Sequence, residues 1–181
     1  ENNIEVITNA EAIGRFRSIT DPELFEIEYW SLEQAKLGSA KEAALARQVV
    51  AITGAGGAIG QATARAFRAA GAEVALLDID ARMTTTLADE LGGLAVSCDV
   101  TDDNSVASAF DAIATRYGGV DILVSNAGAA WQGKIGEVDD KVLRDSFELN
   151  FFAHQRVAKA AVAIMREQAT GGALLFNTSK Q

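Results

Sequence analysis

A run of glycines at residues 53–60 is the first feature of the sequence with a spacing suited to chemistry. It reads Thr-Gly-Ala-Gly-Gly-Ala-Ile-Gly and follows a short apolar stretch, residues 49–53. A phosphate group needs backbone N–H donors without bulky side chains in the way, and glycine permits that approach. A helix that begins directly after such a loop adds positive potential at its N-terminus. The run predicts a phosphate-binding turn between a strand and a helix, although a plain tight turn uses similar residues.

A second chemical group, the carboxylate of Asp78, ends the next apolar stretch, residues 73–78. An acid at the end of the second strand can accept hydrogen bonds from both ribose hydroxyls of an adenosine. The loop and the acid together predict a dinucleotide site, because each stands at the expected strand end. The residues that we expect to bind the cofactor here are Thr53, Gly54, Gly56, Gly57, Ala58, Ile59, Gly60 and Asp78.

The same residues favour NAD over NADP. A carboxylate at position 78 would repel a ribose 2′-phosphate, and the loop residues 55–57 include no basic side chain to hold one. Arg82 is close enough in sequence to turn toward that position. An NADP-dependent reductase of the same fold therefore stays open as an alternative.

The elements that must position this loop alternate between strand and helix. Short apolar stretches predict strands, and helical periodicity fills the segments between them. This alternation predicts an α/β fold, a doubly wound parallel sheet of Rossmann type with strand order 3-2-1-4-5 that is incomplete at its last strand. The expected strands are residues 49–53, 73–78, 94–98, 121–125 and 173–177, and the expected helices include residues 58–70 and one long helix over 139–167.

Residues 1–47 have a different character and predict a helical connector in front of the dinucleotide-binding domain of residues 48–181. Residues 10–18 and 22–37 are expected to be helical. Asp21 is suited to cap the second of these helices, with Pro22 at its first position, where a missing N–H costs little.

Composition excludes several functions. The formal net charge is −9 with no basic stripe, which argues against nucleic acid as a partner. No apolar run approaches the ~20 residues of a membrane helix. The single cysteine, Cys98, cannot form an internal disulfide, which favours the cytoplasm. The single histidine, His154, leaves no basis for a histidine metal cluster or a catalytic triad, so we expect no metal and a packing or surface role for His154.

Five motifs in order resemble the short-chain dehydrogenase/reductase family. Thr53-Gly54-x-x-x-Ala58-x-Gly60 is similar to its cofactor signature, with Ala58 where glycine is commoner, and Ser125-Asn126-Ala127-Gly128 is similar to its N-N-A-G motif. Ser125 departs from that motif and puts one sheet-stabilising hydrogen bond in doubt. The resemblance implies further cofactor contacts at Asp99, Val100, Asn126, Ala127 and Gly128, and catalytic roles for Asn150 and Ser179.

In such enzymes the serine hydrogen-bonds the substrate oxygen, and the asparagine disrupts its helix locally and holds a water in a proton relay. The resemblance also implies a homo-oligomer, either a dimer or a tetramer. Residues 28–37 resemble the connector of bifunctional rhamnulose-phosphate aldolase/short-chain dehydrogenases, in which an aldolase domain comes first. That match implies a small alcohol or aldehyde as substrate, with lactaldehyde as the candidate.

The family's Tyr-x-x-x-Lys motif is not found in the sequence. Tyr29 is followed four residues later by Glu33, and Tyr117 by Asp121. We therefore expect the 181 residues to be part of a longer chain and to be nearly inactive alone, since a general acid–base group contributes typically 10²–10⁴-fold. A non-catalytic dinucleotide-binding or regulatory module is the alternative.

Overall fold

The computed structural model describes residues 20–25, 42–134 and 136–178, which fall in two compact units, Glu1–Glu42 and Ala43–Gln181. In the first unit the described helix is α2, Asp21–Phe25. The expected capping by Asp21 is wrong, because Asp21 already lies inside the helix. Thr20 precedes it, and the Glu23 carboxylate accepts a hydrogen bond from the Thr20 backbone N–H at 2.9 Å, as in a capping box. The expected helix over residues 10–18 and most of that over 22–37 lie outside the described residues.

The second unit is built on a parallel sheet of five strands in the order β3-β2-β1-β4-β5. This order confirms the expected topology, and every strand boundary falls within one residue of its predicted position. The strands are β1 Val49–Thr53, β2 Glu73–Asp78, β3 Leu94–Ser97, β4 Ile122–Ser125 and β5 Ala173–Phe176.

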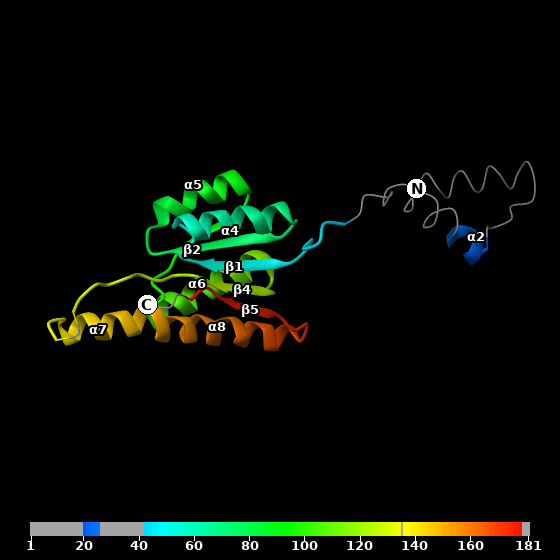
Figure 1. The fold of residues 1–181 in the computed structure, drawn as a ribbon. Helices are drawn as coiled ribbons and strands as arrows, with labels where there is room; N and C mark the ends of the chain where they lie inside the picture. Colours follow the sequence, from blue (N-terminus) through cyan, green and yellow to red (C-terminus); the bar gives the residue numbers. More distant parts are fainter. Residues whose placement is uncertain (1–19, 26–41, 135, 179–181) are drawn as a thin grey trace, which may run out of the picture. The chain divides into compact units, whose positions relative to one another are not determined.

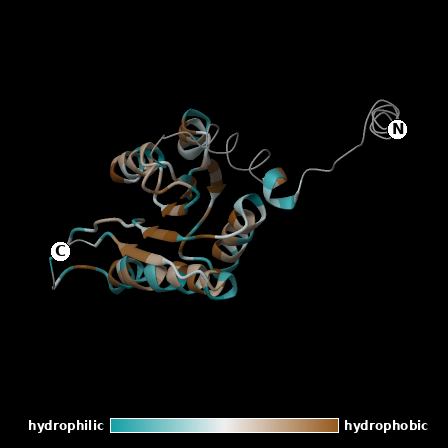
Figure 2. Cartoon of the chain, turned by 90° about the vertical axis from the view of Figure 1, so that its right-hand side faces the viewer, coloured by the Kyte–Doolittle hydropathy of each residue, from teal (hydrophilic) through white to brown (hydrophobic). Residues whose placement is uncertain are grey.

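Helices cover both faces of the sheet (Figure 1). One face carries α4 and α5, and the other carries α6 and the long helical segment that contains α8. Figure 2 shows the apolar strands lying between helices that carry both hydrophilic and hydrophobic residues. The helices are α4 Ala58–Ala69, α5 Ala81–Leu91, α6 Asp103–Tyr117, α7 Asp140–Phe147 and α8 Ala153–Gln168.

The single long helix expected over residues 139–167 is wrong in one respect. Between α7 and α8 lies a π-helical segment, η2, Glu148–Phe152. A π turn accommodates one additional residue and occurs often at functional sites. Asn150 lies in its middle, which agrees with the local helix disruption that the family resemblance implies.

The core is formed by two layers of side chains on either side of the sheet. Val50, Ile52 and Leu76 pack under α4 and α5, while Leu77 and Leu123 pack under α6 and α8. These side chains fix the carboxyl ends of the strands, where open α/β sheets bind their ligands. Within the described ranges, no helix combines the length and apolarity needed to cross a membrane.

Candidate functional site

The glycine loop folds as the expected turn between β1 and α4. Gly54 has a φ of +62°, a conformation that favours glycine. A Cβ at Gly60 would lie 2.7 Å from the Ala55 Cα, so only glycine lets the start of α4 approach the loop this closely. Gly57 occupies the N-cap position of α4 and supplies no side chain to its first N–H groups. The loop therefore presents backbone amides at a helix N-terminus, a geometry that fits a phosphate.

Asp78 lies beside this loop at the end of β2. Its Oδ2 accepts a hydrogen bond from the Gly56 backbone N–H at 2.9 Å, and its Oδ1 accepts one from the Asp80 N–H at 3.1 Å. A Cβ at Gly56 would lie 3.0 Å from the Asp78 Oδ2 and 3.0 Å from the Met83 Cβ. The carboxylate is thus held against the turn, and a larger residue at position 56 would displace it.

Arg82, which the sequence leaves as a candidate for binding a 2′-phosphate, is paired with Asp80. Its Nε and Nη2 each lie 3.0 Å from an Asp80 carboxylate oxygen. The side-chain hydrogen bond from Arg82 lowers the pKa of Asp80, which keeps the pair charged. Turning Arg82 toward the end of β2 would break both contacts.

The ends of β1, β4 and β5 are joined through Asn126. Its backbone N–H donates to the buried Thr53 Oγ1 at 2.9 Å, and its Nδ2 donates to the Thr53 carbonyl at 3.1 Å. Its Oδ1 accepts a hydrogen bond from the Asn177 Nδ2 at 2.7 Å. Asn177 was not among the predicted site residues, although its position directly after the fifth strand was a usable signal.

Asn150 fixes the segment that follows the 126–128 turn. Its Nδ2 donates to the Ala129 carbonyl at 2.8 Å, and its Oδ1 accepts from the Ala129 N–H at 3.1 Å. A Cβ at Gly128 would lie 3.1 Å from the Asn150 Oδ1. The π turn therefore places this side-chain amide against the backbone of the β4–α7 connection.

Ser125 and His154 form a contact that sequence reasoning missed. The Ser125 Oγ lies 2.6 Å from the His154 Nδ1, and the His154 ring meets Phe176 edge to face at 6.1 Å. Burial lowers the pKa of His154 below its usual value. The Ser125 hydroxyl thus joins strand β4 to α8. Ser125 stands at the first position of the motif that resembles N-N-A-G, and its hydroxyl makes this contact in place of an asparagine side chain.

Asp99 and Val100 lie in the connection between β3 and α6. The Asp99 Oδ1 accepts hydrogen bonds from the Thr101 N–H at 2.9 Å and the Thr101 hydroxyl at 2.7 Å. The Asp99 N–H donates to the Ser105 Oγ at 2.9 Å. This connection is therefore held in a defined turn one strand beyond Asp78.

A cavity of about 850 Å³ opens at the carboxyl ends of β1, β4 and β5. Its wall brings together most of the predicted site residues, namely Gly54, Gly57, Ala58, Ile59, Gly60, Asp78, Asn126, Ala127, Gly128 and Asn150. Thr53, Gly56, Asp99 and Val100 are not on this wall, and Ser179 lies outside the described residues. Residues of the wall that were not predicted are Ala129, Ala130, Ser146, Phe147, Phe151, His154, Asn177 and Thr178. A cavity of this volume is within the range that holds a cofactor.

Comparisons with known proteins divide the chain at the same region as the two compact units. The family model described as "short chain dehydrogenase" matches residues 48–181. The model described as "Aldolase class II, second domain" matches residues 1–37. The first match covers more than half of the chain and includes all five strands.

Individual relatives agree with the longer match. An uncharacterized oxidoreductase, YuxG, of Bacillus subtilis is 36% identical over 98% of this chain and 27% of its own length. Galactitol 2-dehydrogenase of Agrobacterium fabrum is 35% identical over 75% of this chain and 54% of its own length. The chain thus spans between about a quarter and half of the length of these relatives.

A solved structure resembles the fold as well. The 7α-hydroxysteroid dehydrogenase complexed with NADH and 7-oxo glycochenodeoxycholic acid superposes with a TM-score of 0.71 at 33% identity. The match covers 78% of this chain and 57% of that one. With a Rossmann-like sheet, a glycine loop at its centre and a family model matched over residues 48–181, the chain belongs to the short-chain dehydrogenase family.

Proposed function

We propose that this chain is the NAD-binding part of an oxidoreductase that transfers a hydride between the nicotinamide cofactor and a small alcohol or aldehyde. The observation that carries the choice of NAD is the Asp78 carboxylate, held against the glycine loop by the Gly56 N–H. The pairing of Arg82 with Asp80 supports it, because the arginine that the sequence leaves as a candidate for holding a 2′-phosphate is paired with a carboxylate.

The residues of the site have distinct roles in this proposal. The amides at the start of α4 bind the pyrophosphate, and Asp78 accepts hydrogen bonds from the adenosine ribose. Asn126, Ala127 and Gly128 line the cavity and are assigned to the nicotinamide half of the cofactor. When bound, the nicotinamide supplies the hydride acceptor or donor. Asn150 holds the 128–129 segment and, with Ser179, is assigned to the substrate side of the reaction.

The cofactor assignment is tested by comparing thermal stabilisation by NAD and by NADP. A ligand at 100 times its dissociation constant stabilises a protein by about 2.7 kcal/mol. We expect NAD to raise the unfolding temperature more than NADP at equal concentration, and Asp78→Asn to reduce that difference. A larger shift with NADP in the unsubstituted chain would reject the NAD assignment.

The substrate proposal is lactaldehyde or a compound of similar size. It is supported by the aldolase-type match of residues 1–37, together with a relative that is named a galactitol 2-dehydrogenase. Because neither tyrosine is followed by a lysine four residues later, we expect these 181 residues alone to show almost no turnover with NAD and lactaldehyde. Rapid turnover by this polypeptide would contradict that expectation. A non-catalytic dinucleotide-binding module would bind NAD and show no turnover with any alcohol or aldehyde.

We further propose that the chain forms a homodimer or tetramer in the cytoplasm. Support comes from apolar side chains exposed on α7 and η2, where Leu143, Phe147 and Phe152 are each about half exposed. A contiguous apolar surface of this kind commonly marks an interface. Light scattering coupled to size-exclusion chromatography tests the proposal, and Phe152→Asp should shift the mass toward the monomer. A monomeric mass for the unsubstituted chain at micromolar concentration would contradict it.

A further inference from the structure

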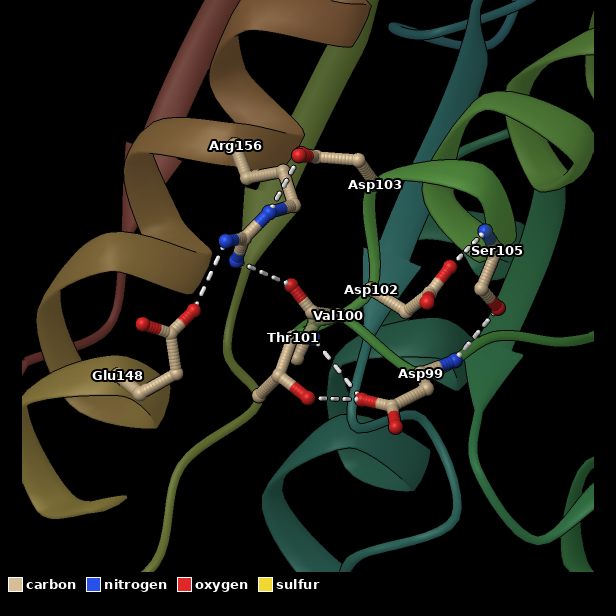
Figure 3. A network of polar contacts seen from close by, with 8 residues as sticks. All are labelled: Asp99, Val100, Thr101, Asp102, Asp103, Ser105, Glu148 and Arg156. Atoms are coloured by element: carbon tan, nitrogen blue, oxygen red, sulfur yellow. Dashed lines mark hydrogen bonds and ion pairs between the residues drawn. The ribbon is translucent and has the colours of Figure 1, made fainter. Parts of the chain in front are cut away.

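Arg156, on the first turns of α8, contacts three separate parts of the fold (Figure 3). Its Nε donates to the Asp103 Oδ1 at 2.7 Å, and its Nη1 donates to the Val100 carbonyl at 3.1 Å. Its Nη2 donates to the Glu148 Oε1 at 2.8 Å. One guanidinium therefore connects the β3–α6 loop, the first turn of α6 and the first residue of the π turn.

This arrangement differs from the surface ion pairs of the molecule. The Arg156 side chain is 19% exposed although its partner Asp103 is 85% exposed, whereas Arg65, which is paired with Glu90, is 46% exposed. Burial opposes the charge, but the hydrogen bonds to Glu148 and Asp103 outweigh it and raise the pKa of Arg156. The planar guanidinium of arginine carries N–H donors that point in several fixed directions, so it can reach these three acceptors at once. The single ammonium of lysine does not offer this geometry.

The two segments that Arg156 joins are assigned to the two ends of the proposed cofactor site. Val100 belongs to the pair expected to contact the adenine, and its neighbour Asp99 is already held by Thr101. Glu148 begins the π turn that contains Asn150, and Asn150 holds Ala129 beside the nicotinamide half of the cavity. A movement of either segment would break a charge-assisted hydrogen bond in the partly buried network.

We propose that Arg156 is a positioning residue that locks the adenine-side loop, residues 99–103, to the π turn of Asn150, so that ligand binding at one end depends on the structure of the other. The inference rests on the proposed dinucleotide function. It adds an energetic connection between the two halves of that site, carried by a residue that does not line the cavity.

The test uses two ligands, AMP and NADH, and measures their dissociation constants by calorimetry on the complete 181-residue chain. AMP reaches only the adenine half, and the hydrogen bond from Arg156 is the contact that connects Glu148 to the loop of residues 99–103 in this proposal. The variants are Glu148→Gln, Arg156→Gln, Arg156→Lys and the double variant Glu148→Gln/Arg156→Gln. Arg65→Gln and Glu90→Gln serve as matched controls, since that pair also makes two hydrogen bonds, at 3.0 and 2.6 Å, on the surface between α4 and α5.

We expect Arg156→Gln to weaken AMP binding roughly tenfold and Glu148→Gln to weaken it about threefold, in the range of couplings carried by intermediate residues. The double variant should bind AMP no more weakly than Arg156→Gln alone, and Arg156→Lys should not restore affinity. A residue that only stabilises the fold would lower the unfolding temperature without making AMP affinity depend on Glu148. Both control variants should leave AMP and NADH affinity unchanged.

Two results would overturn the inference while leaving the proposed function intact. In the first, the unsubstituted chain binds NADH, but Glu148→Gln binds AMP with unchanged affinity. The other is full additivity of the two substitutions, which would mean that they act independently. If Arg156→Gln fails to fold, the AMP affinity of Glu148→Gln alone decides, because this substitution alters a carboxylate that is already 41% exposed. No NADH binding by the wild type would reject the proposed function and the inference together.

Discussion

Strands β1 and β5 lie in the same sheet, yet their environments are opposite. All five residues of β1 are buried, whereas all four residues of β5 are exposed. The difference follows from position, because β1 lies between β2 and β4 with helices on both faces, while β5 pairs with β4 alone among the described strands. The glycine loop and Asp78 are therefore fixed by packed strands, whereas the segment after β5 is held at its start by the Asn177–Asn126 bond. In the proposed function, the cofactor therefore binds at the packed centre of the sheet, and the substrate binds at its less covered edge.

The largest expected loss of stability follows a substitution at the packed centre of the sheet. Gly60→Ala would place a Cβ against the Gly54 carbonyl and 2.7 Å from the Ala55 Cα, contacts that only a backbone shift can relieve. We expect a loss of roughly 5 kcal/mol or more in the free energy of unfolding, which exceeds the effect of most single substitutions. Chemical unfolding followed by circular dichroism measures it.

Gly57→Ala is the matched control for this substitution. The nearest atom to a Cβ at Gly57 is the Gly54 carbonyl oxygen at 3.5 Å, an ordinary contact, and its φ of −74° suits alanine. Its free energy of unfolding should change by less than about 1 kcal/mol. Equal destabilisation by the two substitutions would show that the loop is not packed as described.

The next prediction compares a leucine of the centre with one of the edge. Leu76 is fully buried, and Leu76→Ala should cost about 2–5 kcal/mol of unfolding free energy through lost burial and a cavity. Leu174 is 37% exposed, and Leu174→Ala should cost less than about 1 kcal/mol. Urea unfolding of both variants provides the numbers. A cost at Leu174 equal to that at Leu76 would indicate that β5 is covered in solution, for example by a second copy of the chain.

The sheet and the glycine loop can be predicted from the sequence, whereas the π turn cannot, and the reason is physical. The strand order, the loop and Asp78 follow from patterns that repeat along the chain, since apolar runs, glycines and strand-end acids are local signals. The π turn at Glu148–Phe152 adds one residue to a helical turn, and the periodicity of residues 139–167 cannot reveal it. The local disruption of the helix at Asn150 is expected from the family resemblance instead.

Contacts over long sequence separations were the features that sequence reasoning missed. The Ser125–His154 bond and the three contacts of Arg156, one of them to the backbone carbonyl of Val100, join residues between 8 and 56 positions apart. Nothing in the local pattern indicates which surface arginine of a helix turns inward. Only the packing of α8 on the sheet and beside α6 determines that choice.

A third prediction concerns the hydroxyl that joins β1 to β4. Thr53 is buried, and its Oγ1 accepts hydrogen bonds from the N–H groups of Asn126 and Ala127 at 2.9 and 3.1 Å. Thr53→Val keeps the shape but leaves these N–H groups without that acceptor, so we expect a loss of about 1–3 kcal/mol in the free energy of unfolding. Thr53→Ser retains the hydroxyl and should recover most of the loss. If Thr53→Val is as stable as the wild type, the hydroxyl does not support the turn.

The smallest expected effect is a pH dependence at the edge of the sheet. Burial lowers the pKa of His154 in the folded state. As the pH falls, the imidazole of His154 is therefore protonated in the unfolded chain before it is protonated in the folded chain. Stability from His154 is therefore complete above about pH 6.5 and is lost as the pH falls through that value, with a slope below about 1.4 kcal/mol per pH unit. The carboxylates with lowered pKa values, such as Asp80 and Glu90, titrate at lower pH. Unfolding measured from pH 7.0 to 5.5 should show this loss in the wild type and not in His154→Asn.

The most direct measurement of the central claim is an NMR titration of the isotope-labelled chain with NAD. We expect the largest backbone amide shifts at Gly56, Gly57, Ile59 and Asp78, and unchanged amides on the outer face of α6. Shifts concentrated away from the glycine loop, or none at millimolar NAD, would contradict the assignment of this turn and Asp78 as the dinucleotide site.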